Sequence, residues 1–298
     1  MLIKKAVVTG ASGFIGSAMV RYLVEKGVKV TGFDRIPCKQ DICESYVYDM
    51  CQPGVLDQHL DEETVVFHFA AHADVASSVK DPRTDFNLNI MMLFEVLESV
   101  RRANCQLIFP STGSIFDISN KLPLSEKAYV KPTSPYAASK VAGEAYCAAY
   151  HRSYGLNIKI ARMFSVYGVG MDRFAIHDLI RKIQKNNMEI ELLGDGNQIR
   201  DYLYIDDVVR GLALIAENGS PGEDYNLASG IPVKLIDLAN LIATLMGLKN
   251  IKIIPTGKSF PGDVPRWYAD ITKIQSIGFK PKISLENGLL KTITWLCK

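Results

Sequence analysis

A glycine-rich segment near the start of the chain constrains the fold more than any other feature. An apolar strand pattern from Ile3 to Thr9 runs into Gly10-Ala11-Ser12-Gly13-Phe14-Ile15-Gly16, and a helical stretch follows to about Lys26. Glycines between a strand and a helix permit a tight turn, close helix packing and the approach of a pyrophosphate to backbone amides. We favour this reading over a plain strand-to-helix turn. It predicts a dinucleotide site formed by Gly10, Ser12, Gly13, Phe14, Ile15 and Gly16.

Two acidic residues follow strand-like segments at the same edge of the expected sheet. Val28–Phe33 reads as the second strand, and Asp34 ends it, 18 positions after Gly16. A carboxylate there accepts hydrogen bonds from the adenosine ribose hydroxyls, which favours NAD over NADP, although Arg35 leaves room for NADP. Asp49 follows a shorter segment, where it could meet the adenine amino group or serve only as a loop acid.

The order of elements predicts the fold class. Strand patterns at Thr64–Ala71, Gln106–Pro110 and Asn157–Ala161 alternate with helical patterns at Asn89–Arg102 and Tyr136–Tyr154. This alternation is typical of an α/β fold with a doubly wound (Rossmann) parallel sheet. It breaks down after Tyr167. We therefore expect a Rossmann domain over 1–167, a returning segment near 206–229 and a smaller C-terminal lobe over 168–298.

The expected elements of that lobe are less regular. They are a helix at Phe174–Lys185, a strand at Glu189–Leu193, a polar loop at Gly194–Asp201, helices at Asp206–Glu217, Leu235–Met246 and Leu285–Trp295, and a strand at Ile251–Ile254.

The segment Ser134–Lys140 has the pattern of a helix start. Ser134 suits the N-cap and Pro135 the first helical position. Tyr136 and Lys140 then lie one turn apart on the same face, where an ammonium favours the phenolate and lowers the pKa of the phenol. Activity as a base near neutrality requires a lowering of roughly three units, about 4 kcal/mol. Such a pair is also common as surface decoration.

Hydroxyl groups follow the strand at Gln106–Pro110. Thr112 lies in Ser111-Thr112-Gly113-Ser114, at the carboxyl end of a strand, where ligands bind in such sheets. The alternative is that Thr112 is part of a polar turn.

Two histidines lie in and just after the expected strand Thr64–Ala71. We interpret His68 as a core residue and His72 as a loop residue near a cofactor. No metal site is predicted.

Composition excludes several classes of protein. The 298 residues carry a net charge of +2, which argues against nucleic-acid binding and membrane-surface binding. No apolar run reaches the roughly 18 residues of a transmembrane helix, and the N-terminus lacks the pattern of a signal peptide. The six cysteines show no C-x-x-C spacing. Scattered thiols of this kind fit a reducing environment, so we expect a cytoplasmic protein.

Several segments resemble the motifs of the extended short-chain dehydrogenase/reductase family, in particular its nucleotide-sugar epimerases and dehydratases. The resemblance covers nearly the whole chain, with the motifs in the family's order. The segments are Thr9–Gly16 (T-G-x-x-G-F-I-G), His68–Ala71 (the fourth-strand motif), Asn89, Pro135–Lys140 (P-Y-x-x-S-K), Arg200–Tyr202 with Asp207-Val208, and Pro261–Asp263 with Ala269-Asp270.

The resemblance implies roles for single residues. Tyr136 would be the catalytic base, and Lys140 would hold the nicotinamide ribose and tune the phenol. Thr112 falls at the family's catalytic Ser/Thr position and would hydrogen-bond the sugar hydroxyl that is oxidised. Arg200 would bind the nucleotide diphosphate. The remaining implied contacts are Ala70, Ala71 and Asn89 with the cofactor, and Ser165 and Asp263 with the substrate.

Departures from the family pattern bear on the reaction. Family dehydratases resemble T-D-E where this chain has Thr112-Gly113-Ser114, and the sugar-acid decarboxylases usually carry a glutamate at the third position. Without a carboxylate there, β-elimination lacks its general acid. Further departures are Phe116-Asp117 for the usual Tyr-Gly, Ser165 for an asparagine, and Phe260 for a phosphate-binding arginine that Lys258 or Arg266 could replace.

The sequence therefore predicts an NAD-dependent nucleotide-sugar 4-epimerase. In this reading Tyr136 takes the 4-hydroxyl proton, shared with or relayed by Thr112, while hydride leaves C4 and returns to the other face of a 4-keto sugar. A 4-keto-sugar reductase using NAD(P)H shares every catalytic residue and stays open, with Asp34 favouring the epimerase. A dehydratase, a decarboxylase and a non-catalytic dinucleotide-binding protein are disfavoured. The resemblance also implies a homodimer formed through the helices at Asn89–Arg102 and Tyr136–Tyr154.

Overall fold

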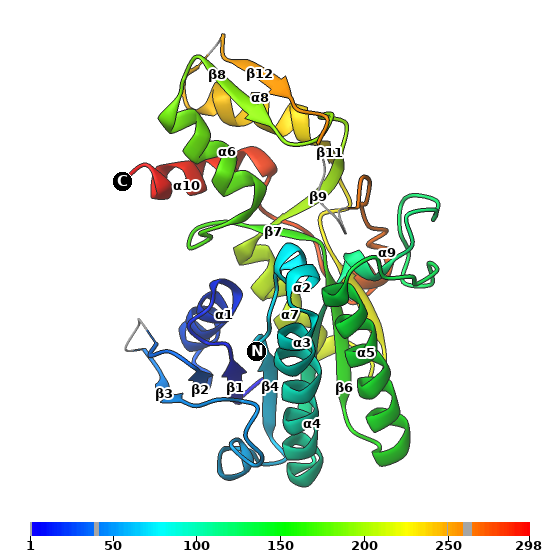
Figure 1. The fold of residues 1–298 in the computed structure, drawn as a ribbon. Helices are drawn as coiled ribbons and strands as arrows, with labels where there is room; N and C mark the ends of the chain where they lie inside the picture. The colour runs from blue at the N-terminus through cyan, green and yellow to red at the C-terminus, as the bar shows by residue number, and fades with distance from the viewer. Residues whose placement is uncertain (1, 39–41, 249, 259–263) are drawn as a thin grey trace.

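A parallel sheet forms the centre of the molecule. The computed structural model describes residues 2–38, 42–248, 250–258 and 264–298. Within these ranges the sheet has seven strands, and the chain runs outward from β1 to β3 before it returns to β4 (Figure 1). The predicted doubly wound parallel sheet is thereby confirmed. In spatial order the strands are β10 (Asp224–Leu227), β6 (Ile158–Met163), β5 (Gln106–Thr112), β4 (Thr64–His68), β1 (Lys5–Thr9), β2 (Lys29–Asp34) and β3 (Glu44–Val47).

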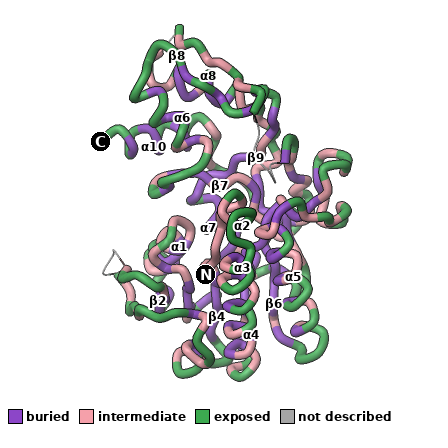
Figure 2. Tube along the Cα trace, viewed as in Figure 1, coloured by how far each residue is buried: buried purple, intermediate pink, exposed green. Residues whose placement is uncertain are grey.

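Helices cover both faces of this sheet. On one face lie α1 (Phe14–Glu25) and α7 (Ile205–Asn218), and on the other α4 (Met92–Ala103) and α5 (Pro135–Tyr154). Successive side chains of β1 show the cause, because Val8 packs with the α1 and α7 side while Val7 packs with the α4 and α5 side. The inner strands are therefore buried from both directions, as Figure 2 shows, whereas the edge strand β3 is mostly exposed.

Short helical segments precede α4. They are α2 (Val75–Lys80), α3 (Pro82–Phe86) and a π-helical turn at Asn87–Met91, and 3₁₀ turns lie at Asp57–His59 and Gly113–Ile115. The π-helical turn carries Asn89. Such turns inside helices frequently occur at functional sites.

The remaining elements lie outside the central sheet, most of them beyond the carboxyl ends of its strands (Figure 1). They are the sheet of β7 (Ser165–Tyr167), β9 (Ile199–Tyr204) and β11 (Pro232–Lys234), the pair β8 (Glu189–Leu192) and β12 (Lys252–Pro255), and helices α6 (Phe174–Lys185), α8 (Leu235–Leu245), α9 (Thr272–Ser276) and α10 (Leu285–Leu296). From the later part of the chain, α7 and β10 return to the central sheet. A domain boundary at residue 167 stays a prediction.

One predicted loop is wrong at its end. The sequence predicts a loop through Asp201, but strand β9 begins at Ile199 and pairs with both β7 and β11. The glycines stop at Gly196, and the next residues are mostly buried. Tertiary pairing thus extends the strand into a segment that looks polar. As a consequence, Arg200 is held on a strand and not on a flexible loop.

Neither a membrane span nor a metal cluster is present in the described part of the chain. No helix there has the length and apolar character needed to cross a bilayer. No group of three or more His, Cys, Asp or Glu side chains there is arranged to hold a metal ion.

Candidate active site

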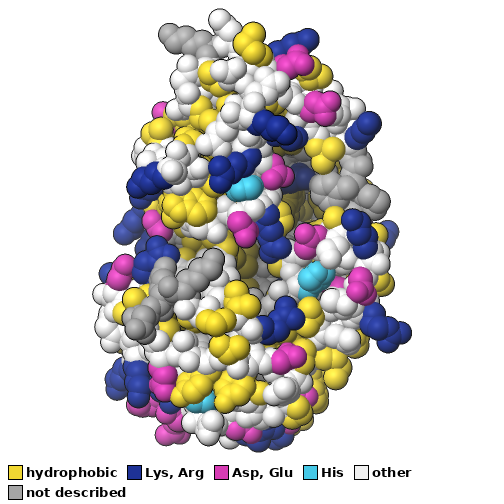
Figure 3. Space-filling model, turned by 60° about the vertical axis from the view of Figure 1, so that its left-hand side comes forward, with side chains coloured by type: hydrophobic (Ala, Val, Ile, Leu, Met, Phe, Trp, Pro, Cys, Tyr) yellow, Lys and Arg dark blue, Asp and Glu magenta, His cyan; other side chains and the backbone are white. Residues whose placement is uncertain are grey.

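A cavity of about 970 Å³ lies at the carboxyl ends of the central strands. Its wall includes the segments that follow β1, β2, β4 and β5, together with residues of β7 and β9. Figure 3 shows a hollow on one face of the molecule, with both acidic and basic side chains around it. Ligands bind in this region of a doubly wound fold, because the strand order reverses there.

The chain between β1 and α1 leaves no room for a side chain at Gly10 or at Gly16. Gly10 has a φ of +69°, and a Cβ atom there would lie 2.6 Å from the backbone nitrogen of Ala70. A Cβ atom at Gly16 would lie 2.0 Å from the carbonyl oxygen of Gly10. Helix α1 begins after Gly13 without a capping hydrogen bond from a side chain, so its first amides suit an anionic ligand. The predicted residues Gly10, Ser12, Gly13, Phe14, Ile15 and Gly16 all line the cavity.

Asp34 lies on the cavity wall at the end of β2, as the sequence predicts. One carboxylate oxygen accepts a hydrogen bond from the backbone N–H of Ser12 at 2.9 Å, and the other accepts one from Arg35 at 2.7 Å. The second oxygen also accepts from the backbone N–H of Ile36 at 3.3 Å, so the oxygen bonded to Ser12 is the one that keeps a further lone pair for a ribose hydroxyl. Asp49 differs, because its side chain accepts from the backbone N–H of Cys51 at 3.0 Å and the neighbouring Met50 lines the cavity instead. An adenine contact from Asp49 stays a prediction.

The segment after β4 is held from behind by Asn89. Ala70 and Ala71 line the cavity, whereas Asn89 is buried and is not part of the wall. Its side-chain oxygen accepts from the backbone N–H of His72 at 2.9 Å. Its nitrogen donates to the Asp85 carboxylate at 2.9 Å and lies 3.1 Å from the carbonyl oxygen of His72. The geometry favours a structural role for Asn89, and a direct cofactor contact stays a prediction.

Thr112, Tyr136 and Lys140 meet on one side of the cavity. Helix α5 starts as predicted, because the Ser134 hydroxyl caps it by accepting from the backbone N–H of Ala137 at 3.2 Å. Lys140 is buried, and its ammonium donates to the carbonyl oxygen of Pro110 at 2.9 Å. This bond ties the lysine to β5, the strand that also ends in Thr112.

The net pKa shift of Tyr136 is opposite to the expected lowering, because burial outweighs the nearby positive charge. Burial raises the pKa of Tyr136 to about 12, and smaller opposing effects come from a hydrogen bond with Thr112 and from the charge of Arg173. Burial also lowers the pKa of Lys140 to about 8. Desolvation is the largest effect on both side chains, and it disfavours the charged form of each. A helical spacing of four residues cannot reveal this, because it carries no information about burial.

The far side of the cavity is formed by residues outside the central sheet. Ser165 in β7 and Arg200 in β9 both line it. The Arg200 guanidinium donates to the carbonyl oxygen of Ile199 at 2.9 Å and lies 5.9 Å from the centre of the Trp267 ring. Lys258 and Arg266 are not among the lining residues. The predicted Asp263 contact and the departure at Phe260 lie outside the described residues.

Trp267 is a site residue that the sequence reasoning missed. Its ring stacks on Phe164 with 5.0 Å between centroids, and both rings line the cavity. A Cβ atom at Gly113 would lie 2.7 Å from the Trp267 ring. The absence of a carboxylate at position 113 therefore has a steric reason, since the indole occupies that space. No local pattern signals this contact, because Gly113 and Trp267 lie 154 positions apart in the chain.

A family model described as the NAD dependent epimerase/dehydratase family matches residues 6–228. The chain belongs to this family. UDP-glucuronate 4-epimerase from Thermodesulfobacterium geofontis is 31% identical, and the alignment covers 97% of this chain and 95% of that protein. The predicted resemblance to nucleotide-sugar epimerases is thereby confirmed.

Solved structures of epimerases share the fold over almost the whole chain. UDP-N-acetylglucosamine 4-epimerase from Methanobrevibacter ruminantium, in complex with UDP-N-acetylmuramic acid, has a TM-score of 0.92 and 29% identity, covering 100% of this chain and 99% of that one. UDP-glucose 4-epimerase from Thermus thermophilus, in complex with NAD, has a TM-score of 0.88 and 27% identity, covering 98% and 99%.

The cavity fits the cofactor of this NAD-dependent family. The glycine cradle between β1 and α1 leaves backbone amides for a pyrophosphate, and Asp34 presents a carboxylate at the end of β2. Further lining residues that the sequence reasoning did not assign are Ser111, Ser114 and Arg173. The Ser111 hydroxyl oxygen is buried and has no hydrogen-bond partner among the residues that the structure describes.

Proposed function

We propose that this family member is a nucleotide-sugar 4-epimerase that acts on a UDP-sugar. The observation that carries the proposal is the meeting of Thr112, Tyr136 and Lys140 on one cavity wall beside the glycine cradle, with no carboxylate at positions 113 and 114. The similar 4-epimerases named above act on or bind UDP-sugars, which supports UDP as the nucleotide. The sugars of these relatives differ, so the experiment below tests which UDP-sugar this protein converts.

Tyr136 is the proposed base for the 4-hydroxyl proton. NAD, when bound, supplies a hydride acceptor that later returns the hydride, and its oxidised ring carries a positive charge. A phenol with a pKa of about 12 must be stabilised as phenolate by about 7 kcal/mol to ionise at pH 7. Fixed positive charge in a dry cavity is the means by which a protein does this. The charge of Arg173 already acts in this direction, and we propose that the buried Lys140 ammonium adds to it once the cofactor is bound.

Thr112 and Lys140 have distinct proposed roles. The Thr112 hydroxyl lies 3.1 Å from the Ser114 hydroxyl, within hydrogen-bond distance, and it also forms a hydrogen bond with the Tyr136 phenol. It can therefore hold the 4-hydroxyl while the proton moves. Lys140 is fixed by its bond to Pro110 and keeps further protons for a ribose hydroxyl of the cofactor.

The wall at Gly113 argues against elimination chemistry. Loss of water from the neighbouring carbon needs a general acid beside the tyrosine. Trp267 fills the space that a side chain at position 113 would need. Reversible oxidation at one carbon needs only the tyrosine and its hydroxyl partner, so epimerisation is the reaction that these residues support.

The substrate contacts of Ser165 and Arg200 are part of the same proposal. Both residues line the cavity on the side away from the glycine cradle. Arg200 is anchored on a strand and carries the charge that a diphosphate requires. Asp263 remains a proposed substrate contact from the sequence alone.

Turnover of UDP-sugars by the wild type and by Tyr136→Phe tests the proposal. We expect the purified wild type to interconvert one 4-epimeric pair among UDP-glucose, UDP-N-acetylglucosamine and UDP-glucuronate, measured by chromatography. Tyr136→Phe should lose at least about 100-fold in kcat, because a general base is worth 10²–10⁴. Tyr146→Phe, an exposed residue on the same helix, is the matched control and should keep full activity. Wild-type turnover in Tyr136→Phe would refute the assignment.

We also propose a homodimer formed through α4 and α5. Large apolar side chains near these helices are exposed, with Phe86 at 49%, Met91 at 44% and Phe94 at 37%. An apolar surface of this kind gains stability when a second copy covers it. Light scattering at micromolar concentration should give twice the mass of the chain. A monomer would contradict the proposal.

A further inference from the structure

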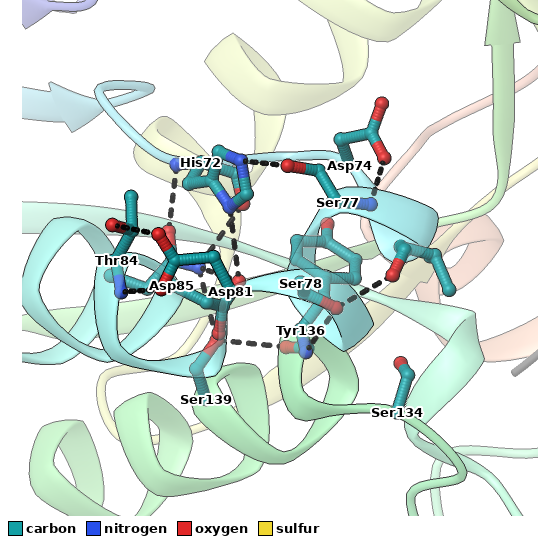
Figure 4. A network of polar contacts seen from close by, with 12 residues as sticks. His72, Asp74, Ser77, Ser78, Asp81, Thr84, Asp85, Ser134, Tyr136 and Ser139 are labelled. Atoms are coloured by element: carbon teal, nitrogen blue, oxygen red, sulfur yellow. Dashed lines mark hydrogen bonds and ion pairs between the residues drawn. The ribbon is translucent and has the colours of Figure 1, made fainter.

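The peptide groups of Tyr136 are held from two sides by serine hydroxyls. The backbone N–H of Tyr136 donates to the Ser78 hydroxyl at 3.1 Å. Its carbonyl oxygen accepts from the Ser139 hydroxyl at 2.8 Å. Figure 4 shows both serines beside Tyr136, with Ser78 on the neighbouring helix α2. Both the backbone N–H and the backbone carbonyl of Tyr136, in the first turn of α5, are thus held by hydrogen bonds.

The bond to Ser78 has a clear physical reason. The first N–H groups of a helix have no partner inside the helix. In α5 the backbone N–H of Ala137 uses the Ser134 hydroxyl, so the N–H of Tyr136 needs another acceptor. Ser78 supplies it from 58 positions earlier in the chain. Without that acceptor, a backbone donor in a largely buried place would lose its hydrogen bond.

The Ser78 hydroxyl is itself fixed in direction. Ser78 has 0% exposure, and its hydroxyl donates to the carbonyl oxygen of Val75, one turn earlier in α2, at 2.7 Å. With the proton used in this way, a lone pair is directed at the N–H of Tyr136. The serine therefore acts as a rigid acceptor and not as a rotating surface hydroxyl.

Helix α2 also forms part of the cavity wall. Asp74, Val75 and Ala76 line the cavity, and the Asp74 carboxylate caps α2 by accepting from the backbone N–H of Ser77 at 2.7 Å. Ser78 itself does not line the cavity. It joins the back of this wall to the first turn of α5, so the wall and the phenol are positioned relative to each other.

The second serine is held by a polar network that Figure 4 also shows. The Ser139 hydroxyl accepts from the side-chain nitrogen of Asn89 at 3.1 Å. Asn89 in turn bonds to Asp85 and to the His72 backbone. These side chains come from the π-helical turn, from α3 and from the segment after β4. Tyr136 is therefore fixed against three separate parts of the fold.

We propose that Ser78 is a positioning residue that sets the place of the Tyr136 phenol by accepting the hydrogen bond of its backbone N–H. The inference rests on the proposed role of Tyr136 as the base. A shift of the first turn of α5 moves the phenol relative to Thr112, which belongs to β5. Misplacement of a catalytic group by about 1 Å costs up to about 100-fold in rate.

Three variants of neighbouring residues test the proposal. Ser78→Ala removes the acceptor. Ser78→Thr keeps a hydroxyl that can bond to the carbonyl of Val75 in the same way. Ser77→Ala is the matched control on the same helix, because the Ser77 hydroxyl lies 3.1 Å from the His72 ring and does not contact Tyr136.

The first readout is steady-state kinetics on the UDP-sugar that the wild type converts, well below the unfolding temperature. We expect Ser78→Ala to lower kcat at least about tenfold with a KM within about twofold of the wild type. Ser77→Ala should keep kcat within about twofold, and Ser78→Thr should recover most of the loss. A kcat of Ser78→Ala equal to that of the wild type overturns the proposal, and so does an equal loss in Ser77→Ala. A lower unfolding temperature with unchanged kcat would indicate a purely structural role and also overturns it.

The second readout needs no substrate. Hydrogen exchange of the Tyr136 amide, followed by NMR, should be slow in the wild type and in Ser77→Ala, and at least about tenfold faster in Ser78→Ala. Equal exchange in all proteins overturns the proposal. A wild type that converts no UDP-sugar would instead contradict the proposed function, and the exchange measurement would still decide whether Ser78 holds the Tyr136 backbone.

Discussion

Acid should destabilise this protein through one buried histidine. His68 ends β4 with 3% exposure, as the sequence predicts for a core residue. The Thr9 hydroxyl accepts from the backbone N–H of Ala70 at 3.2 Å and lies 2.8 Å from Nδ1 of His68, to which it can donate its own proton when the imidazole is neutral. Burial, with a smaller effect from the charge of Lys140, lowers the pKa of His68 from 6.5 to about 3.

The direction and size of the effect follow from proton linkage. Between pH 6.5 and 3 the unfolded chain binds a proton at His68 that the folded protein does not bind, so stability falls as the pH decreases through this range. Above pH 6.5 the contribution is complete and constant. At pH 5 the loss from this single residue is about 2 kcal/mol, since one pKa unit corresponds to 1.36 kcal/mol. A loss of that size is a large part of the stability of an ordinary domain.

Urea unfolding of the wild type and of His68→Asn at pH 7.5, 6.0 and 5.0 measures this effect. Asparagine keeps an acceptor for the Thr9 hydroxyl but does not titrate. The variant should be less stable at pH 7.5, because it removes buried volume. Between pH 7.5 and 5.0 the free energy of unfolding of the wild type should fall by about 2 kcal/mol more than that of the variant, because carboxylates titrate alike in both proteins. Parallel stability curves over this range would refute the reasoning.

Three further substitutions have defined outcomes. Asp34→Ala should weaken NAD binding at least about tenfold in a calorimetric titration, because hydrogen bonds to a charged group contribute about 1.5–3 kcal/mol; unchanged affinity would contradict the role of Asp34. Gly113→Ala should destabilise by about 1–3 kcal/mol through overpacking against Trp267, and the loss should shrink when Trp267→Ala is added; additive losses would disprove the contact. Asp201→Asn should lower the free energy of unfolding by about 3 kcal/mol or more, because the buried carboxylate accepts four hydrogen bonds from Ser229, Gly230 and Ala269. The control Asp206→Asn should have little effect, because the Asp206 side chain is exposed.

Local signals predicted the elements that have a strong periodic or capping pattern. The helix at Phe174–Lys185 has the predicted bounds, since its apolar residues recur on one face and become the buried Ile176, Leu179, Ile180 and Ile183. Ser134 and Pro135 marked the start of α5 correctly. The three-residue strands β7 and β11 were not predicted, because such short segments carry no periodicity and exist through their pairing with β9.

The candidate site also contains residues that the sequence predicts and residues that it does not. The glycine cradle, Asp34 and the Tyr136–Lys140 pair belong to continuous segments, so their residue types could be read from the sequence. Trp267 could not, because it reaches the cavity by tertiary packing alone. The pKa of Tyr136 was predicted in the wrong direction for a related reason. Charge spacing along a helix is visible in a sequence, whereas desolvation depends on what the rest of the chain places around the phenol.

The position of β10 at the edge of the central sheet sets a condition on biosynthesis. Strand β6 ends at Met163, and the strand that covers its outer edge ends at Leu227, 64 residues later. At about 5–20 residues per second, a ribosome needs roughly 3–13 s to synthesise the chain from the end of β6 to the end of β10. During this interval the nascent sheet presents an unpaired strand edge, which is a template for aggregation. A product truncated between these strands would carry every residue from the glycine cradle to Lys140 and would still be expected to aggregate.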